Sequence, residues 1–272
     1  MIIRLFCPKC AYEGSKSLVD YAEVEVPLPV TRLTDDGTYE ARCGRGHISS
    51  VRLLNAKFEL LFEMGLNALV DGYAREAVSS FAASLERFYE FYWRVAMRHL
   101  SAPEEAVSNA WKSLSRQSER QLGAYISASL LLEHKMPQLL NPNKDIEFRN
   151  AVIHKGYIPS IEEAMEFGNT VMAIINGTLD NLRRLAPEAV KEIYESLLPK
   201  RPDETAESAD EITGAVNILT PVDVMHPPEP GDGRLGKVSD QFARILSERE
   251  PKKLALLSKE EMKRRRPNHF QE

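Results

Sequence analysis

The run 149–154, which reads RNAVIH, contains an arginine, an amide and a histidine close together in the sequence. Asn150 and His154 are four positions apart, so a helix would place their side chains on one face. RNA carries its own nucleophile, the 2′-hydroxyl, and its cleavage needs only a base, an acid and a cation for the phosphate. An imidazole moves protons near neutral pH, and the guanidinium of Arg149 is shaped to hold phosphate oxygens. These residue types therefore indicate RNA cleavage without a metal.

The spacing from Arg149 to His154 is not specific by itself, because three other histidines also follow an arginine by five positions: residues 47, 99 and 269. A purely structural interpretation is open as well. Arg149 would then pair with Glu147 or Asp145, Asn150 would cap or pack, and His154 would satisfy the end of a helix. The elements around the run decide between these interpretations.

The predicted elements place the run at the end of a short helix. This helix is expected from Asn141 or Asn143 to Lys155, with Gly156 as its left-handed cap. Ser160, with Glu163 three positions later, forms a capping box that starts the next helix. His154 would therefore stand in the last helical turn.

Apolar residues recur at helical spacing through most of the chain between residues 53 and 198. They predict helices over 58–72, 77–99, 103–134, 164–185 and 187–198, with a break near Gly123 in the third. The aromatic group at 88–93 is expected to fill the core and a dimer interface rather than stack on bases. The fold class is therefore mainly α, an up-and-down bundle.

The run 148–164, FRNAVIHKGYIPSIEEA, resembles the signature of the HEPN superfamily, and the resemblance covers residues 54–198. HEPN proteins are helical bundles, usually dimeric, and many are metal-independent ribonucleases of toxin–antitoxin, abortive-infection and RNA-processing systems. The resemblance implies catalytic roles for Arg149, Asn150 and His154. It also implies that Glu86, on the similar early helix at 77–94, reaches the site.

The resemblance implies that the protein is a homodimeric endoribonuclease that cuts single-stranded or loop RNA in defence or stress. It also allows for a protein partner that neutralises this activity. Other HEPN proteins have lost activity and bind nucleic acid or protein. An inactive adaptor is therefore the alternative.

Three cysteines and a histidine near the start of the chain have the spacing of a zinc site. Cys7 and Cys10 form a CxxC pair, and Cys43 and His47 form a CxxxH pair after 32 intervening residues. Zinc prefers four such ligands in a tetrahedron, and a closed set of four is a structural site. A redox CxxC is the alternative, but it would need a βαβ context that this region lacks. Residues 1–52 therefore resemble a β zinc ribbon, with alternating residues at 24–30 predicting a strand and Asp36-Gly37 a hairpin turn.

Composition sets the remaining limits. The 272 residues are 43% hydrophobic and 28% charged, with a net charge of −5, so any binding of nucleic acid must be local. No apolar run reaches the roughly 20 residues needed to span a bilayer, so no membrane partner is expected, and the cysteine usage fits a cytoplasmic location. After residue 199 the chain is rich in Pro, Asp, Glu and Gly. The expected division is a ribbon at 1–52, a bundle at 53–198, and a linker with a partly disordered tail at 199–272. Within that tail, the segment 212–224 could add a strand or pack on the body.

Overall fold

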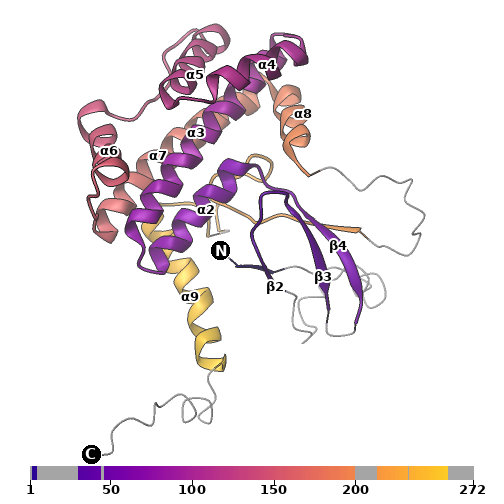
Figure 1. The fold of residues 1–272 in the computed structure, drawn as a ribbon, viewed down its shortest axis with the longest axis vertical. Helices are drawn as coiled ribbons and strands as arrows, with labels where there is room; N and C mark the ends of the chain where they lie inside the picture. The colour runs from indigo at the N-terminus through magenta and orange to yellow at the C-terminus, as the bar shows by residue number, and fades with distance from the viewer. Residues whose placement is uncertain (1, 5–29, 44–45, 200–212, 232, 257–272) are drawn as a thin grey trace, which may run out of the picture.

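The protein is mainly helical with a small β-sheet, as its sequence predicts (Figure 1). The computed structural model describes residues 2–4, 30–43, 46–199, 213–231 and 233–256. Cys7 and Cys10, and most of the strand predicted at 24–30, lie outside these residues. None of the helices formed by the described residues is both long and apolar enough to cross a membrane.

Helix α3 (Ala74–His99) is the centre of the helical body, and it contacts α2, α4, α5, α6, α7 and α8 (Figure 1). Its aromatic residues at 88, 89 and 91–93 are all buried, which confirms that this group fills the core. Helices α2 (Lys57–Val70) and α7 (Ile161–Leu185) both approach the buried ring of Phe81 through glycines. A Cβ added to Gly65 of α2 would lie 2.5 Å from one edge of this ring, and a Cβ added to Gly168 of α7 would lie 2.8 Å from the other. The two glycines therefore allow close packing against α3.

The third helical region is interrupted earlier than its sequence predicts. Helix α4 (Glu104–Leu114) has Ser115 as its C-cap, and α5 (Ser118–Glu133) contains Gly123 in its interior, so the break predicted near Gly123 is wrong. Gln117 is extended between the two helices. The side chain of Gln121 donates to the carbonyl of Ser115 (3.1 Å), and that of Arg120 donates to the carbonyl of Ser113 (3.3 Å). These contacts satisfy carbonyls that a helix end leaves without partners, so α4 can stop there. The last bundle helix, α8 (Pro187–Leu197), begins and ends as predicted.

The strands of the described residues form two small sheets. Strands β1 (Ile2–Arg4) and β2 (Val30–Arg32) pair antiparallel, and so do β3 (Thr38–Arg42) and β4 (Ile48–Leu53). The turn at Asp36-Gly37, where Gly37 has φ +64, precedes β3. The strand predicted at 24–30 lies mostly outside the described residues, so the hairpin predicted at this turn stays a prediction. The sheet continues on the other side of β4 with β5 (Thr213–Val216), which runs parallel to β4.

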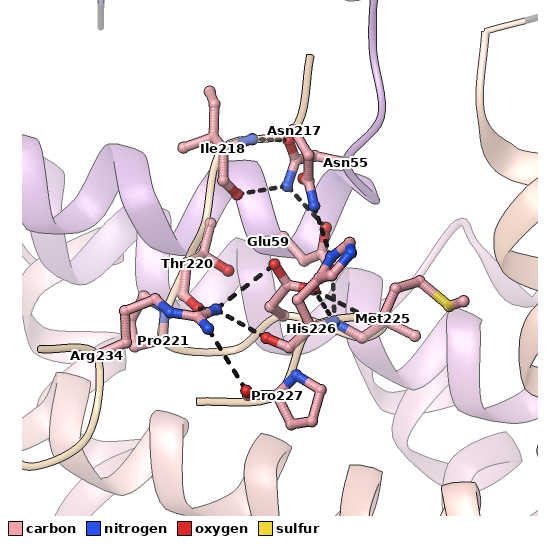
Figure 2. A network of polar contacts seen from close by, with 12 residues as sticks. Asn55, Glu59, Asn217, Ile218, Thr220, Pro221, Met225, His226, Pro227 and Arg234 are labelled. Atoms are coloured by element: carbon pink, nitrogen blue, oxygen red, sulfur yellow. Dashed lines mark hydrogen bonds and ion pairs between the residues drawn. The ribbon is translucent and has the colours of Figure 1, made fainter. Parts of the chain in front are cut away.

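After β5, residues 217–231 and 233–236, here called the strap, precede α9 (Val238–Leu256). Polar contacts with Asn55 and Glu59 join the strap to the start of α2 (Figure 2). The side chain of Asn55 exchanges hydrogen bonds with the backbone of Ile218 (2.9 and 2.8 Å). The carboxylate of Glu59, fully buried on α2, accepts from the backbone N–H of Val224 (2.7 Å). The predicted tail thus includes a strand and a segment packed on the folded body, and the division at residue 199 does not separate them from it.

A second buried carboxylate, that of Asp223, lies in the strap. It accepts from the backbone N–H of His226 (2.7 Å), and the guanidinium of Arg234 is 3.7 Å from its other oxygen (Figure 2). Burial, and then the negative charge of Asp223, raise the pKa of Glu59 to about 8. The strap is therefore fixed by buried polar groups rather than by a large apolar face.

Candidate functional site

The helix that carries the candidate residues forms as its sequence predicts. A π-helical turn, η2 (Pro142–Ile146), leads into α6 (Glu147–His154), and the side chain of Asn141 caps it by accepting from the N–H of Asn143 (3.0 Å). Gly156, with φ +75, follows the helix end, and the N–H of Tyr157 returns to the carbonyl of Ala151 (3.0 Å). This closing turn places His154 in the last turn of α6.

The loop after α6 is held by the start of α7. The Ser160 side chain accepts from the N–H of Glu163 (3.1 Å), and the Glu163 carboxylate accepts from the N–H of Ser160 (2.8 Å), which confirms the predicted capping box. The hydroxyl of Tyr157 also donates to Glu163 (2.9 Å). These contacts lower the pKa of Glu163 from its usual value and fix the chain on both sides of the helix end.

Three of the four candidate residues come together between α3 and α6. The guanidinium of Arg149 is 2.7 Å from the carboxylate of Glu86 and donates to the side-chain oxygen of Asn150 (3.2 Å). Both charged side chains are partly open to solvent, with exposed fractions of 21% for Arg149 and 28% for Glu86. The pair is therefore fixed in place but reachable from outside.

The structural alternative for Arg149, an ion pair with Glu147 or Asp145, is not what the structure shows. Arg149 bonds Glu86, which lies 63 positions earlier in the sequence. Asp145 is buried and accepts from the backbone N–H of Asn141 (2.9 Å). The carboxylate of Asp145 thus contributes to the local turn, and the arginine contact is a tertiary one.

His154 is not part of this cluster. Its side chain is exposed, and it makes no hydrogen bond or ion pair with the residues that the structure describes. One copy of the chain therefore presents a polar cluster built on an ion pair, and separately an imidazole that is open to an external partner.

A cavity of about 270 Å³ opens beside the Glu86–Arg149 pair, between α3, α5 and α6. Its wall is mostly apolar, and its polar side chains belong to residues 86, 89, 118, 119, 149 and 150. The sequence interpretation did not include Tyr89, Ser118 or Glu119 in the site. The one signal for Tyr89 is its spacing of three positions from Glu86, which puts both on one face of α3. Burial, then the nearby Tyr125 and the charge of Glu86, raise the pKa of Tyr89 above its usual value.

The predicted zinc ligands are described only in part. Cys43 is buried directly after β3, and its N–H donates to the carbonyl of His47 (3.1 Å) while the N–H of Gly46 donates to the carbonyl of Cys43 (2.9 Å). This tight turn brings the two residues of the CxxxH pair close in space, as a metal knuckle requires. Among the described residues no group of three or more potential ligands could hold a metal ion, but Cys7 and Cys10 are not among them. The zinc site therefore stays a prediction.

Comparison with models of protein families, with curated proteins and with solved structures finds no match to this chain.

Proposed function

We propose that this protein is a metal-independent endoribonuclease of the HEPN type, which acts as a homodimer on single-stranded or loop RNA in defence or stress. The ion pair between Glu86 and Arg149 is the observation that supports this most. It joins the acidic and basic residues that the resemblance implies, from two helices, beside an open cavity.

The reaction follows from the chemistry of these groups. His154 accepts the proton of the 2′-hydroxyl, whose oxygen then bonds to phosphorus. The bond from phosphorus to the 5′-oxygen breaks, and that oxygen takes a proton from His154 of the partner subunit. Arg149 stabilises the charge that develops on the phosphate, while Glu86 and Asn150 orient its guanidinium. The products carry a 2′,3′-cyclic phosphate and a free 5′-hydroxyl.

Zinc has no step in this reaction. Cys7, Cys10, Cys43 and His47 would hold one ion with all four positions filled by protein, so it would stabilise the N-terminal region and carry no reactive water. Cleavage should accordingly survive EDTA in a short assay.

Assembly is the part of the proposal that one chain does not supply. One exposed His154 per copy provides either the base or the acid, so a second copy must provide the other. Light scattering at micromolar concentration should therefore give twice the mass of the chain. A monomer that still cleaves RNA would contradict the two-copy reaction.

The test of the function uses variants of the candidate residues and a control from the same chain. His154→Ala and Arg149→Ala should each reduce cleavage of single-stranded RNA by roughly 10²–10⁴-fold without unfolding the protein. His99→Ala is the matched control, because His99 is also exposed, ends a helix and follows an arginine by five positions. Cleavage that persists in His154→Ala, or that falls equally in His99→Ala, would refute the assignment.

An inactive adaptor is a second candidate function. The observation that favours it is the absence of His154 from the cluster around Arg149, whose guanidinium is already paired with Glu86. The adaptor would bind RNA or protein at the same surface. Absence of cleavage on every RNA tried, together with Arg149-dependent binding, would establish it in place of the enzyme.

A further inference from the structure

One buried carboxyl group at the start of α2 holds the strap. The carboxylate of Glu59 has none of its surface exposed and accepts from the backbone N–H of Val224 in the strap (2.7 Å). It also accepts from the N–H of Ala56 (2.9 Å) and from the side chain of Asn55 (3.0 Å) (Figure 2). Asn55 in turn accepts from the N–H of Ile218 (2.8 Å), so two backbone N–H groups of the strap bond side chains at this point.

A second buried carboxylate lies in the strap itself. Asp223, which precedes Val224 in the chain, also has none of its surface exposed, and one of its oxygens accepts from the N–H of His226 (2.7 Å). Its other oxygen accepts no hydrogen bond from the described residues and lies 3.7 Å from the guanidinium of Arg234. Two buried negative charges repel each other more strongly than charges in water. The closed strap therefore favours the protonated form of Glu59, and burial and then the charge of Asp223 raise the pKa of Glu59.

Other ionisable groups face this pair from α7, α8 and the strap. Arg183 of α7 donates to two strap carbonyls (2.6 and 3.0 Å) and pairs with Asp180 (2.9 Å). Tyr194 of α8 stays neutral, because burial raises the pKa of its hydroxyl. His226 lies 3.5 Å from Asp223, and its side chain is 59% exposed. An imidazole can change charge near neutral pH, so a test must separate His226 from the carboxyl pair.

The strap can open while the helical bundle stays folded. It is held at α2 through side-chain acceptors, because the N–H groups of Ile218 and Val224 bond side chains rather than a neighbouring strand. The side chains that it places in the main core are the small ones of Val222 and Val224. Segments with few buried apolar contacts open locally at a lower free energy than the core. The strap is therefore expected to lift from α2 before α3 unfolds.

We propose that Glu59 and Asp223 form a pH-dependent switch, in which the strap stays on α2 while Glu59 is protonated and lifts from it more readily once Glu59 has lost its proton to solvent. Lifting lets water reach the new carboxylate and moves it away from Asp223, which relieves both its burial and the repulsion. The switch is separate from the proposed RNA cleavage, and its test needs no RNA.

The direction and size of the response follow from Glu59. Its pKa is about 8 while the strap is closed, and it returns towards the usual value of 4.5 once water reaches the group. The closed form is therefore favoured fully below pH 4.5, and this advantage is lost as the pH rises through about 8. The equilibrium constant for opening should rise by at most about tenfold per pH unit between pH 5 and 8, and it should level off above about pH 8.

Hydrogen–deuterium exchange of the full-length protein measures this opening directly. The amides of Ile218 and Val224 are followed by NMR from pH 5 to 9, with correction for the pH dependence of intrinsic exchange. Their opening constants should rise and level off as described, and they should exceed those of α3 amides by at least about tenfold at every pH. Opening constants that do not change with pH, or that equal those of α3, would overturn the inference.

Three variants assign the response to one group. Glu59→Gln keeps an oxygen that accepts from the N–H of Val224 but cannot ionise, so opening of the strap should no longer change with pH. Glu133→Gln is the matched control, since its side chain is only 5% exposed and bonds the hydroxyl of Tyr92 in the bundle (2.8 Å). Glu133→Gln and His226→Gln should both retain the response. A response that survives in Glu59→Gln, or that disappears in His226→Gln, would show that Glu59 does not control the strap.

A substitution on the strap side supplies a test that does not depend on the folding of Glu59→Gln. Asp223→Asn keeps an oxygen for the N–H of His226 and removes the charge that repels ionised Glu59. The opening constant should then level off at a lower pH than in the natural protein. An unchanged levelling-off point in Asp223→Asn would remove Asp223 from the switch and overturn the pair.

Discussion

The contact of Phe81 with two glycines gives a prediction about stability in which two substitutions on one helix have different effects. Gly168 and Gly177 both lie inside α7, and alanine is preferred over glycine in a helix interior by about 0.8–1 kcal/mol. A Cβ at Gly177 would meet open space, whereas a Cβ at Gly168 would lie 2.8 Å from the Phe81 ring. Gly177→Ala should therefore stabilise the protein by about 1 kcal/mol.

Gly168→Ala should lose this gain, because the ring has little room to retreat. Phe81 is fully buried, and Gly65 approaches it closely enough that a Cβ there would lie 2.5 Å away. Overpacking of this kind costs about 1–3 kcal/mol. Since the helix preference is the same for both variants, Gly168→Ala should be less stable than Gly177→Ala by about 1–3 kcal/mol.

Urea unfolding of the two variants and the natural sequence measures this difference. Thermal unfolding gives a second measurement: in a domain of about 150–250 residues, a change of 1 kcal/mol in the free energy of unfolding shifts the melting temperature by roughly 2–4 °C. Phe81→Leu should reduce the gap between the two alanine variants, because it removes the ring that the new methyl group meets. Equal stability of Gly168→Ala and Gly177→Ala would refute the close packing of α7 on α3.

Three further predictions concern ionisation, the ion pair and the metal. The pKa of Glu59 is raised to about 8 in the folded protein from 4.5, so its stabilising contribution is present below pH 4.5 and is lost as the pH rises through about 8. Between pH 5 and 8 the free energy of unfolding of the natural protein, measured with urea, should therefore fall by at most about 1.4 kcal/mol per pH unit because of this group. Glu59→Gln should remove this fall, and parallel profiles for the two proteins would contradict the reasoning. Glu86→Gln should remove the ion pair that orients Arg149 and so reduce RNA cleavage. Glu76→Gln, at an exposed position of the same helix, should leave cleavage unchanged. Equal effects of the two substitutions would refute the role of the ion pair. Elemental analysis should find one zinc per chain that Cys43→Ser removes, with the helical circular dichroism retained; unchanged zinc in the variant would refute the ligand set.

The sequence predicts the helices better than their interruptions. Apolar spacing locates α2, α3, α7 and α8, because each buries a continuous stripe. The break between α4 and α5 depends instead on side chains such as Gln121 that return to the backbone, and glycine alone does not signal it. Gly123 stays helical because a helix tolerates one glycine at modest cost.

The candidate site is predictable only where local spacing or the resemblance supplies it. The position of His154 at a helix end follows from Gly156 and the capping box. The contact of Glu86 with Arg149 spans 63 positions and entered only through the resemblance. The cavity lined by Tyr89 depends on how α5 packs against α3, which no local pattern encodes.

The sequence indicates the strap only in part: the segment 212–224 could add a strand or pack on the body, but its contacts could not be predicted. Proline, glycine and acidic residues predict a segment that buries little apolar surface. Its attachment comes from buried polar contacts instead, such as the bond from Val224 to Glu59 across 165 positions. A pattern-based prediction cannot pair a carboxylate with a backbone N–H so far away.

The parallel pairing of β4 with β5 has a consequence during synthesis of the protein on the ribosome. From Leu53, where β4 ends, to Thr213, where β5 begins, the chain advances 160 positions. At about 5–20 residues per second, the β4 edge waits roughly 8–30 s for its partner strand. An unpaired strand edge is a template for pairing with other chains. Nascent chains that stall before residue 213 are therefore the form of this protein most prone to aggregate or to need a chaperone.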